Sequence, residues 1–415
     1  MILTCRPQRR IATLCLAAAV LHVVNGCESN SAPQNGDGPG VTKTVLISAA
    51  ASSLHQQEAT LAQSSGGRIV VVWIGFLDED TGAATIEYTI SDDFGQSWGP
   101  ATPVSIPREV GVLNDPALTV DANGNFTLAA LGFNVPGVRR HSGVYVYMLP
   151  AGASAFGAAV SVDQLDPTDQ LFYFDKPQIA ITKSGYLVTY SLMGSGGEGG
   201  LPISRAGIAA TSSDGVSWQH DTLATNAPAG ITLCAASQSI VAVYFSQSAR
   251  GLWTAASDNG RTWQAPAVLD QGASGSWFPS CVGRGSDVWV LYAGSASTAR
   301  LARSTDGGVH FSTIPVGVNG SVSWPAFAVR ADGTVDVGYY TSSNQLPFGF
   351  ARSLLRPGAT TFEFVETLRS GLQIPTTRQG RNGLVDFIGI IPGAIAFTDN
   401  SSGTSHIAFA RYPAP

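Results

Sequence analysis

The sequence predicts an all-β protein that folds as a single β-propeller of seven four-stranded blades. Two observations carry this prediction. Glycine is abundant, with 47 among 415 residues, and only 13% of the residues are charged, about half the usual share. In addition, short strands separated by turns recur with a period of roughly 40–60 residues, which is typical of propeller blades.

Each repeat consists of four predicted strands, and residues 278–316 contain one complete unit. A glycine or asparagine turn joins the first two strands, a variable loop leads to the third, and a turn containing Asp-Gly leads to the fourth. The alternation of apolar and polar residues, rich in β-branched and aromatic types, favours strands over helices. We expect seven second strands, with six blades as the alternative, at 70–76, 126–133, 185–193, 239–246, 287–294, 334–342 and 393–399.

The two ends of the repeat region complement each other. The last unit has a second strand, GAIAFTD, and a third, HIAFARY, but the chain then reaches PAP without a fourth strand. Residues 43–49, KTVLISA, form a lone strand that is similar to the fourth strands of other units. We therefore expect 43–49 to complete the last blade and close the ring, which protects the sheet edges. The propeller would then be one domain, residues 43–415.

Residues 1–26 have the pattern of a targeting segment, with basic residues in MILTCRPQRR followed by the apolar run IATLCLAAAVLHVV. The segment ends at Val24-Asn25-Gly26-Cys27, which resembles the lipobox of bacterial lipoproteins. The resemblance implies a lipid on Cys27, a flexible tether over 27–42 and a place in the cell envelope, either periplasmic or at the cell surface. Ordinary signal cleavage near Gly26 is the alternative, and it would give a secreted protein.

The formal net charge is −6. A mildly acidic surface argues against nucleic acid as a partner and against membrane contact other than through the lipid anchor. We expect a monomer.

Four turns resemble the Asp boxes, or BNR repeats, of the sialidase superfamily, which read Ser-x-Asp-x-Gly-x-x-Trp. Two match fully if Phe replaces Trp, and two match in part. The full matches are Ser91, Asp93, Gly95 and Trp98, and Ser304, Asp306, Gly308 and Phe311; the partial ones are Asp258, Gly260 and Trp263, with Ala256 in the serine place, and Gly215 and Trp218, with Ser213 in the aspartate place. We expect structural hairpins, in which Asp accepts hydrogen bonds from the turn and Gly supplies a positive φ. Each turn has too few oxygens for calcium.

Cys234 and Cys281 remain after the targeting segment 1–26 and the candidate lipidation residue Cys27 are set aside. They occupy the same position in the first strands of consecutive units, so they would lie on neighbouring strands near the axis. A disulfide is expected if their Cα atoms approach within about 7 Å, and two buried thiols are the alternative. No histidine stands beside either cysteine, so we expect no metal site.

The face opposite the Asp boxes is where the resemblance places ligands. First strands begin there, and the loops between second and third strands lie there. The candidate ligand-face residues are Glu58, Asp115, Arg139, Arg140, Asp175, Lys176, Trp277, Trp324, Arg378, Arg381 and Asp386. Aromatic rings stack on sugars and carboxylates bind hydroxyl groups, so this set suggests a glycan or protein ligand. The alternative is that polar residues line a wet channel and tryptophans fill the space between blades.

The resemblance to sialidases also implies a retaining glycoside hydrolase with three arginines, a Tyr–Glu pair and an Asp acid/base. The family's Phe/Tyr-Arg-Ile-Pro motif is missing, because residues 105–110, SIPREV, have another order, so no catalytic residue is assigned. No nucleotide-binding fingerprint occurs, and we expect no cofactor. The favoured interpretation is an envelope-anchored propeller that binds a glycan or a protein at the channel mouth. The alternatives are a sialidase-like hydrolase with a non-standard active site and a non-catalytic scaffold.

Overall fold

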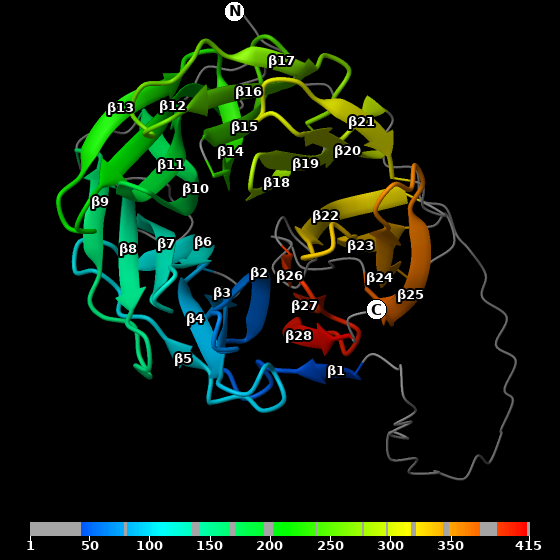
Figure 1. Ribbon diagram of the computed structural model, residues 1–415. Helices are drawn as coiled ribbons and strands as arrows, with labels where there is room; N and C mark the ends of the chain where they lie inside the picture. Colours follow the sequence, from blue (N-terminus) through cyan, green and yellow to red (C-terminus); the bar gives the residue numbers. More distant parts are fainter. Residues whose placement is uncertain are drawn as a thin grey trace, which may run out of the picture. The chain divides into compact units, whose positions relative to one another are not determined.

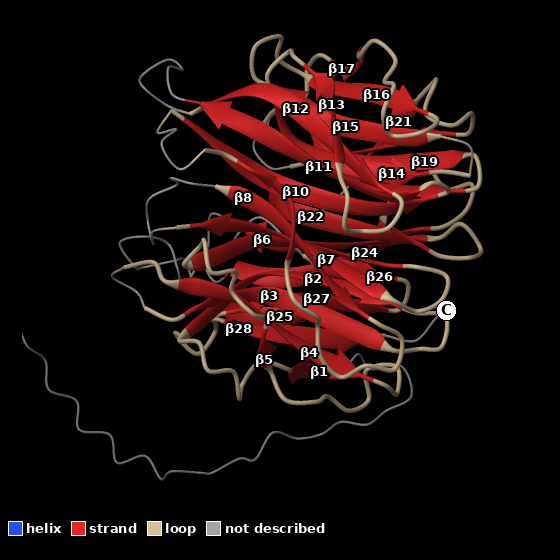
Figure 2. Cartoon of the chain, turned by 90° about the vertical axis from the view of Figure 1, so that its left-hand side faces the viewer, coloured by secondary structure: helices blue, strands red, loops and turns tan. Residues whose placement is uncertain are grey.

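Seven four-stranded antiparallel sheets surround a central axis (Figure 1). The computed structural model describes residues 43–78, 81–134, 142–166, 171–194, 202–237, 239–275, 278–295, 298–316, 321–342, 348–373 and 388–412. Within these residues every regular element is a strand (Figure 2), and no helix is present that could cross a membrane. The predicted seven-bladed propeller is confirmed, and the six-bladed alternative is wrong.

The blades follow one another along the chain, each with its innermost strand first. Blades 1 to 4 consist of β2 (His55–Gln63), β3 (Ile69–Phe76), β4 (Ala84–Ser91) and β5 (Thr102–Pro103); β6 (Val112–Val120), β7 (Phe126–Phe133), β8 (Gly143–Leu149) and β9 (Val160–Gln164); β10 (Phe172–Thr182), β11 (Gly185–Gly194), β12 (Ile203–Ser212) and β13 (Gln219–Ala224); and β14 (Pro228–Ala235), β15 (Ile240–Ser246), β16 (Leu252–Ser257) and β17 (Ala267–Asp270).

The remaining three blades complete the ring. They consist of β18 (Ser280–Arg284), β19 (Asp287–Ala293), β20 (Ala299–Ser304) and β21 (Ser312–Pro315); β22 (Ser321–Val329), β23 (Val335–Ser342), β24 (Phe348–Leu355) and β25 (Glu363–Leu372); and β26 (Gly389–Ile391), β27 (Ala394–Asp399), β28 (His406–Arg411) and β1 (Lys43–Leu46). The seven predicted second strands agree with β3, β7, β11, β15, β19, β23 and β27 to within one residue at each end.

The N-terminal strand closes the ring, as the sequence predicts. β1 pairs antiparallel with β28, from Lys43 opposite Arg411 to Leu46 opposite Ala408, and becomes the outer strand of blade 7. The strand is shorter than the predicted 43–49. The two chain segments continue side by side for one further bond, in which the Ile47 N–H donates to the Ile407 carbonyl at 2.9 Å.

The second strands are apolar on both sides because each blade packs between two others. All eight residues of β7 are buried, for example. Tyrosines on these strands also bond to the preceding blade: the Tyr190 hydroxyl donates to Asp163 at 2.6 Å, and the Tyr292 hydroxyl donates to Asp270 at 2.9 Å. Since both acceptors lie on outer strands, β9 and β17, these bonds fasten neighbouring blades together.

The four turns between third and fourth strands, which we call the aspartate turns, are held by their own side chains. In the turn 91–98 the Ser91 hydroxyl donates to Asp93 Oδ1, and the Gly95 N–H donates to the Ser91 hydroxyl, each at 2.8 Å. Gly95 has φ +82°, and a Cβ there would lie 2.6 Å from the Phe409 ring. Hydrogen bonds, first from the Ser97 hydroxyl and then from its N–H, lower the pKa of Asp93 to about 2. This turn is satisfied locally, which is a structural role.

Two aspartate turns differ from the sequence interpretation. In 212–218, Ser212 and Asp214 make the contacts expected of the serine and the aspartate, whereas Ser213 does not take the aspartate place. In 257–263, Ser257 and Asn259 make them, so the assignments of Asp258 and Ala256 are wrong. The reason is that both turns are one residue shorter, and the capping side chain directly precedes the glycine.

Candidate functional site

Five inner strands share a β-bulge near the end at which they begin, the end opposite the aspartate turns. The bulges interrupt the pairing of β2, β6, β10, β14 and β22 with the next strand. At this place the backbone is left-handed, with φ of +55° at Glu58, +49° at Asp115, +51° at Lys176, +59° at Gly230 and +44° at Trp324. Four of the five are not glycine, and such conformations cost about 1–3 kcal/mol each and gather at functional sites.

Three of these bulge residues meet as a charged group, which we call the mouth cluster: Glu58, Asp115 and Lys176. The Lys176 ammonium lies 2.9 Å from Asp115 Oδ1 and 3.6 Å from Glu58 Oε2. The residues come from three consecutive blades, and each is only 8% or 9% exposed. Two carboxylates and one ammonium give the cluster a formal charge of −1, in a place where removing any one charge would be costly.

An aromatic ring borders the mouth cluster. The Lys176 ammonium lies 5.3 Å from the centre of the Phe278 ring, within the range of a cation–π contact. The same ring lies against the backbone of Gly230, where any Cβ would collide with it. The bulge of blade 4 therefore carries glycine because a ring from blade 5 occupies the space of a side chain.

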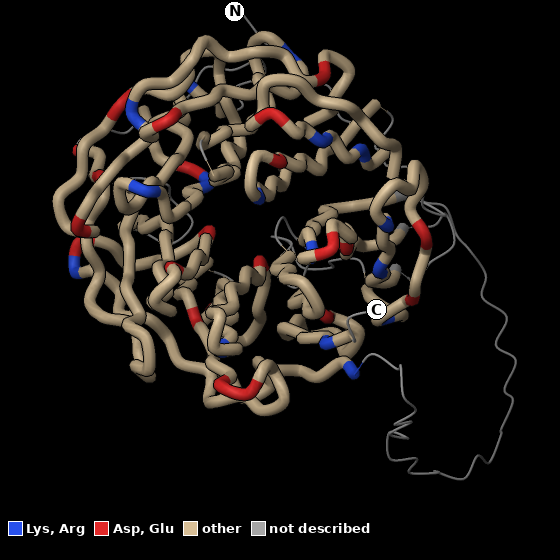
Figure 3. Tube along the Cα trace, viewed as in Figure 1, with Lys and Arg blue, Asp and Glu red and all other residues tan. Residues whose placement is uncertain are grey.

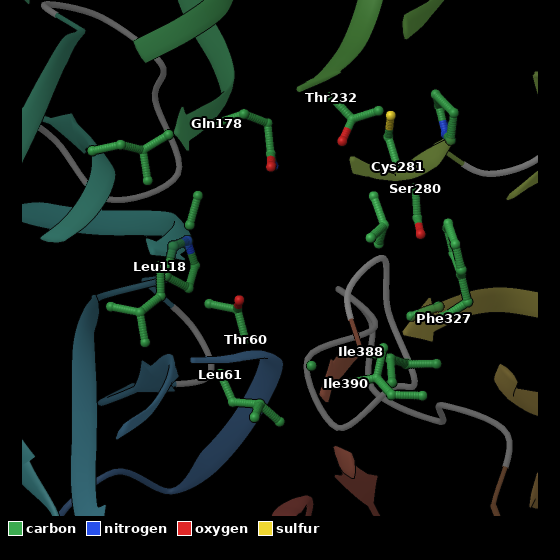
Figure 4. A pocket seen from close by; sticks show the side chains of 17 residues that line it. Thr60, Leu61, Leu118, Gln178, Thr232, Ser280, Cys281, Phe327, Ile388 and Ile390 are labelled. Carbon is green, nitrogen blue, oxygen red and sulfur yellow. The ribbon is translucent and has the colours of Figure 1, made fainter. Parts of the chain in front are cut away.

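Along the axis the inner strands enclose a cavity of about 220 Å³, which we call the channel cavity. Figure 4 shows its side chains converging from several blades. Its polar groups are Thr60, Gln178, Thr232 and Ser280, and its largest apolar ones are Leu61, Leu118, Phe327, Ile388 and Ile390. None of the described residues that line it is charged. Each of the five bulged strands contributes to the cavity wall the residue that stands two positions after its left-handed residue, where regular strand pairing resumes.

The predicted ligand-face residues fall into three groups. Glu58, Asp115 and Lys176 come together, and Asp175 precedes Lys176 on β10, half-buried. Trp324 is half-buried and packs edge-on against Tyr340 at 6.3 Å between ring centres, which fits a role in filling space between blades. Outside the described residues lie Arg139, Arg140, Trp277, Arg378, Arg381 and Asp386, as well as Cys27.

A disulfide joins Cys234 of β14 to Cys281 of β18, with the Cα atoms 5.4 Å apart. The sequence interpretation placed the two cysteines at equivalent positions of their strands, and this is wrong. Cys234 pairs with Val241, three residues before Tyr244, whereas Cys281 pairs with Val290, two before Tyr292. Cys281 lines the channel cavity, and Cys234 is buried.

Sequence reasoning missed a second charged group, which we call the hairpin cluster: Arg330, Asp336, Arg352, Glu366 and Tyr412. Asp336 is fully buried and accepts hydrogen bonds from Arg330 Nη2 at 2.9 Å and from Arg352 Nη2 at 3.2 Å. Arg352 also donates to Glu366 at 2.9 Å and lies 3.7 Å from the centre of the Tyr412 ring. Burial, and then the Asp336 carboxylate, raise the pKa of Tyr412.

The hairpin cluster lies between blades 6 and 7, and the hairpin from β22 to β23 puts it at the end of the propeller that carries the aspartate turns. The charges of its arginines and carboxylates balance. Across the molecule, acidic and basic positions are interspersed around the ring rather than gathered into a field of one sign (Figure 3). The described residues contain no group of three or more metal-ligating side chains.

The comparisons with known proteins identify the fold. No protein-family model matches the sequence, and no curated protein is similar to it in sequence. Three solved structures are similar: a Hadza microbial sialidase, Hz136 (13% identity, 70% of this chain and 64% of that one, TM-score 0.52); a Dyadobacter fermentans protein of unknown function (16%, 90% and 99%, 0.53); and a Trypanosoma rangeli sialidase in complex with 2,3-difluorosialic acid (13%, 73% and 54%, 0.50).

These likenesses show a sialidase-like propeller fold. At 13% to 16% identity they show the fold alone. The chain matches less than two thirds of the length of either sialidase, 64% and 54%. What the protein does has to be argued from its own residues.

Proposed function

We propose that this protein binds a glycan or a protein ligand at the channel mouth, without catalysis, and that a lipid on Cys27 holds it at the cell envelope. One observation carries the binding proposal. Glu58, Asp115 and Lys176 converge from three blades, each on a left-handed bulge residue, at the face where first strands begin. Because folding alone does not require charged residues at strained positions, their presence there favours a function.

The chemistry of the mouth cluster suits recognition of a polar ligand. Carboxylate oxygens accept hydrogen bonds from hydroxyl groups, the ammonium donates them, and the Phe278 ring offers an apolar face. Each of the three charged residues keeps about a tenth of its surface exposed. A ligand at the mouth could therefore exchange hydrogen bonds with groups that the fold already orients.

A sialidase-like hydrolase is the second candidate, and the fold favours it. Against it stands the geometry of the two carboxylates, which flank one ammonium. A general acid must be protonated before it donates, whereas a shared ammonium favours the charged form of both groups. Binding is therefore the better account of the mouth cluster.

The binding proposal is tested with a glycan array and a panel of envelope proteins. The purified protein is compared with Lys176→Met and with the matched control Lys183→Met, which removes an exposed lysine from the opposite end of the propeller. We expect binding by the native protein and by Lys183→Met, and its loss in Lys176→Met. Since Lys176→Met removes an ammonium that lies beside two buried carboxylates, a neutral triple variant, Glu58→Gln/Asp115→Asn/Lys176→Met, is measured beside it.

Turnover distinguishes the two candidates. Release of a fluorophore from a sialic acid glycoside by the native protein would contradict binding without catalysis. For the envelope proposal, fatty-acid labelling in a bacterial host is expected for the native precursor and not for Cys27→Ser. Labelling of both, or of neither, would contradict a lipid on Cys27.

A further inference from the structure

The segments that join strands at the mouth end, which we call the mouth loops, differ between two sides of the ring. Each runs from a second strand to a third, or from a fourth strand to the next first strand and its bulge. In blades 1 to 3 they are residues 47–58, 77–83, 104–115, 134–142, 165–176 and 195–202; in blades 4 to 7 they are 225–230, 247–251, 271–279, 294–298, 316–324, 343–347, 373–388 and 400–405.

The two sides carry different charge. In blades 1 to 3 the sequence of the mouth loops contains ten acidic and four basic residues, a formal charge of −6. In blades 4 to 7 it contains one acidic and three basic residues, a formal charge of +2. Over the ring as a whole the two signs are interspersed (Figure 3), so this separation is a property of the mouth loops. An acidic sector of this kind attracts partners of positive charge.

The acidic side also exposes aliphatic side chains. Leu54, Leu77, Ile106 and Leu171 are 52%, 44%, 39% and 63% exposed, and all four belong to the mouth loops of blades 1 to 3. Among the described residues of the mouth loops in blades 4 to 7, no large apolar side chain is exposed to this degree. One exposed leucine is ordinary, but four on three consecutive blades, within the acidic segments, have the composition of an interaction surface.

Hydrogen bonds hold two of these mouth loops in place. The Leu54 N–H donates to the Phe76 carbonyl at 2.8 Å, which sets Leu54 beside the chain that continues into Leu77. The Tyr147 hydroxyl donates to the carbonyl of the residue before Ile106 at 3.0 Å. An exposed apolar side chain on an ordered backbone costs a partner little ordering entropy, which favours binding.

We propose that the mouth loops of blades 1 to 3 dock a basic segment of a partner protein. Apolar side chains of the partner cover Leu54, Leu77 and Leu171, and its lysines and arginines face the acidic residues of the same loops. Charge complementarity selects this partner, because an anionic lipid surface would be repelled and a neutral glycan offers neither cations nor aliphatic side chains. The inference goes beyond the proposed function, since it needs no ligand in the mouth itself.

The test uses the whole protein and three probes: an amphipathic peptide of leucine and lysine, the same peptide with glutamate in place of lysine, and phosphatidylglycerol vesicles. The docking variant is Leu54→Ser/Leu171→Ser. The matched control, Val216→Ser/Val309→Ser, removes two valines that are 63% and 67% exposed on the aspartate turns at the other end.

We expect only the leucine–lysine peptide to bind. Its affinity should fall about tenfold or more in the docking variant and stay unchanged in the control, because the control leaves the acidic side intact. Binding should also weaken as the salt concentration rises from about 50 to about 500 mM, since the exposed charges are then screened. Thermal unfolding confirms that each variant is folded.

Several results would overturn the inference. Equal binding of the leucine–glutamate peptide or of the vesicles would contradict a basic protein partner, and so would an equal loss in the control variant. Failure of every probe to bind would contradict a docking surface. If array ligands still bind in a Lys176-dependent manner, the proposed function survives that failure. If the peptide binds through Leu54 and Leu171 while Lys176→Met changes nothing on the array, the inference survives and the proposed function fails.

Discussion

The two ends of the propeller repeat different kinds of backbone feature. At one end the aspartate turns place positive φ mostly on glycine and satisfy their side chains within a few residues, as Ser91 and Asp93 do. At the other end the bulges place positive φ on Glu58, Asp115, Lys176 and Trp324, and the charges find partners on other blades. Repetition alone therefore does not indicate a functional site. What distinguishes the mouth is strain combined with side chains that depend on neighbouring blades.

A charged group by itself does not indicate a site either, and the hairpin cluster shows why. Asp336 is fully buried between two arginines, and the arrangement joins blades 6 and 7. We interpret it as structural because its charges balance and its groups bond to one another. The mouth cluster differs in that each of its residues stands two positions before a residue that lines the channel cavity.

The largest effect is expected when the hairpin cluster is broken. Asp336→Ala leaves Arg330 and Arg352 buried without their shared carboxylate, which should cost about 3–5 kcal/mol of unfolding free energy. The control is Asp287→Ala, which breaks a partly exposed pair with Arg303 and should cost about 1 kcal/mol or less. Urea denaturation measures both. Equal losses would show that the hairpin cluster is no more important than a surface pair.

The disulfide should follow in size. Cys234→Ala/Cys281→Ala removes a link that spans 47 residues and joins the inner strands of blades 4 and 5, and we expect a loss of about 2–4 kcal/mol. Reduction of the native protein with dithiothreitol should lower the midpoint of urea denaturation as far as the double substitution does. An unchanged midpoint in both experiments would contradict the link.

A smaller effect is expected at the bulge that already carries glycine. Gly230→Ala adds a Cβ at φ +59° and pushes it into the Phe278 ring, whereas Gly152→Ala, at φ +75°, meets no atom within 4 Å. We expect Gly230→Ala to be less stable than Gly152→Ala by about 1–3 kcal/mol, as for overpacking of a core. Thermal unfolding of both variants measures the difference. Equal stability would mean that the Phe278 ring moves aside without a cost in free energy.

The smallest effect should appear at an aspartate turn. The pKa of Asp93 is lowered to about 2 because the ionised carboxylate accepts hydrogen bonds from Ser97 and its neighbours. A lowered pKa in the folded state gives stability that is present above about pH 4, the ordinary value of an aspartate, and is lost as the pH falls through about 2. NMR titration of the Asp93 carboxyl carbon should give a midpoint near pH 2, and Ser97→Ala should raise it. A midpoint near 4 in the native protein would contradict the local bonding.

The sequence predicts the fold well because each repeat unit has the same local pattern of strand and turn residues. Strand alternation and the turn residues recur in every blade, and the missing fourth strand of the last unit matches the lone strand at 43–49. It also places Glu58, Asp115 and Lys176 on one face, among the other candidate ligand-face residues, but it does not single them out as a group. The bulges themselves could not be predicted, because a register shift depends on the pairing with the next strand.

Other features depend on contacts between blades, for which the sequence has no periodic sign. Asp336 and Arg352 lie on β23 and β24 of blade 6 and Arg330 directly follows β22, while Tyr412 follows β28 of blade 7. The sequence interpretation misassigns the shorter aspartate turns because Asp214 and Asn259 stand directly before the glycine, whereas Asp93 stands two residues before it. The polar residues of the channel cavity are likewise of ordinary type, such as Thr60 and Ser280, and nothing in the sequence around them marks them as cavity residues.

The most direct test of the difference between the two ends is a binding comparison of two matched variants. One is the neutral mouth variant, Glu58→Gln/Asp115→Asn/Lys176→Met, and the other is the turn variant Asp93→Asn/Asp306→Asn. Both are titrated with the glycan that binds the native protein best on the array. We expect the turn variant to bind with native affinity and the mouth variant to lose binding while remaining folded. Retained binding in the mouth variant, or loss in a folded turn variant, would contradict a ligand site at the channel mouth.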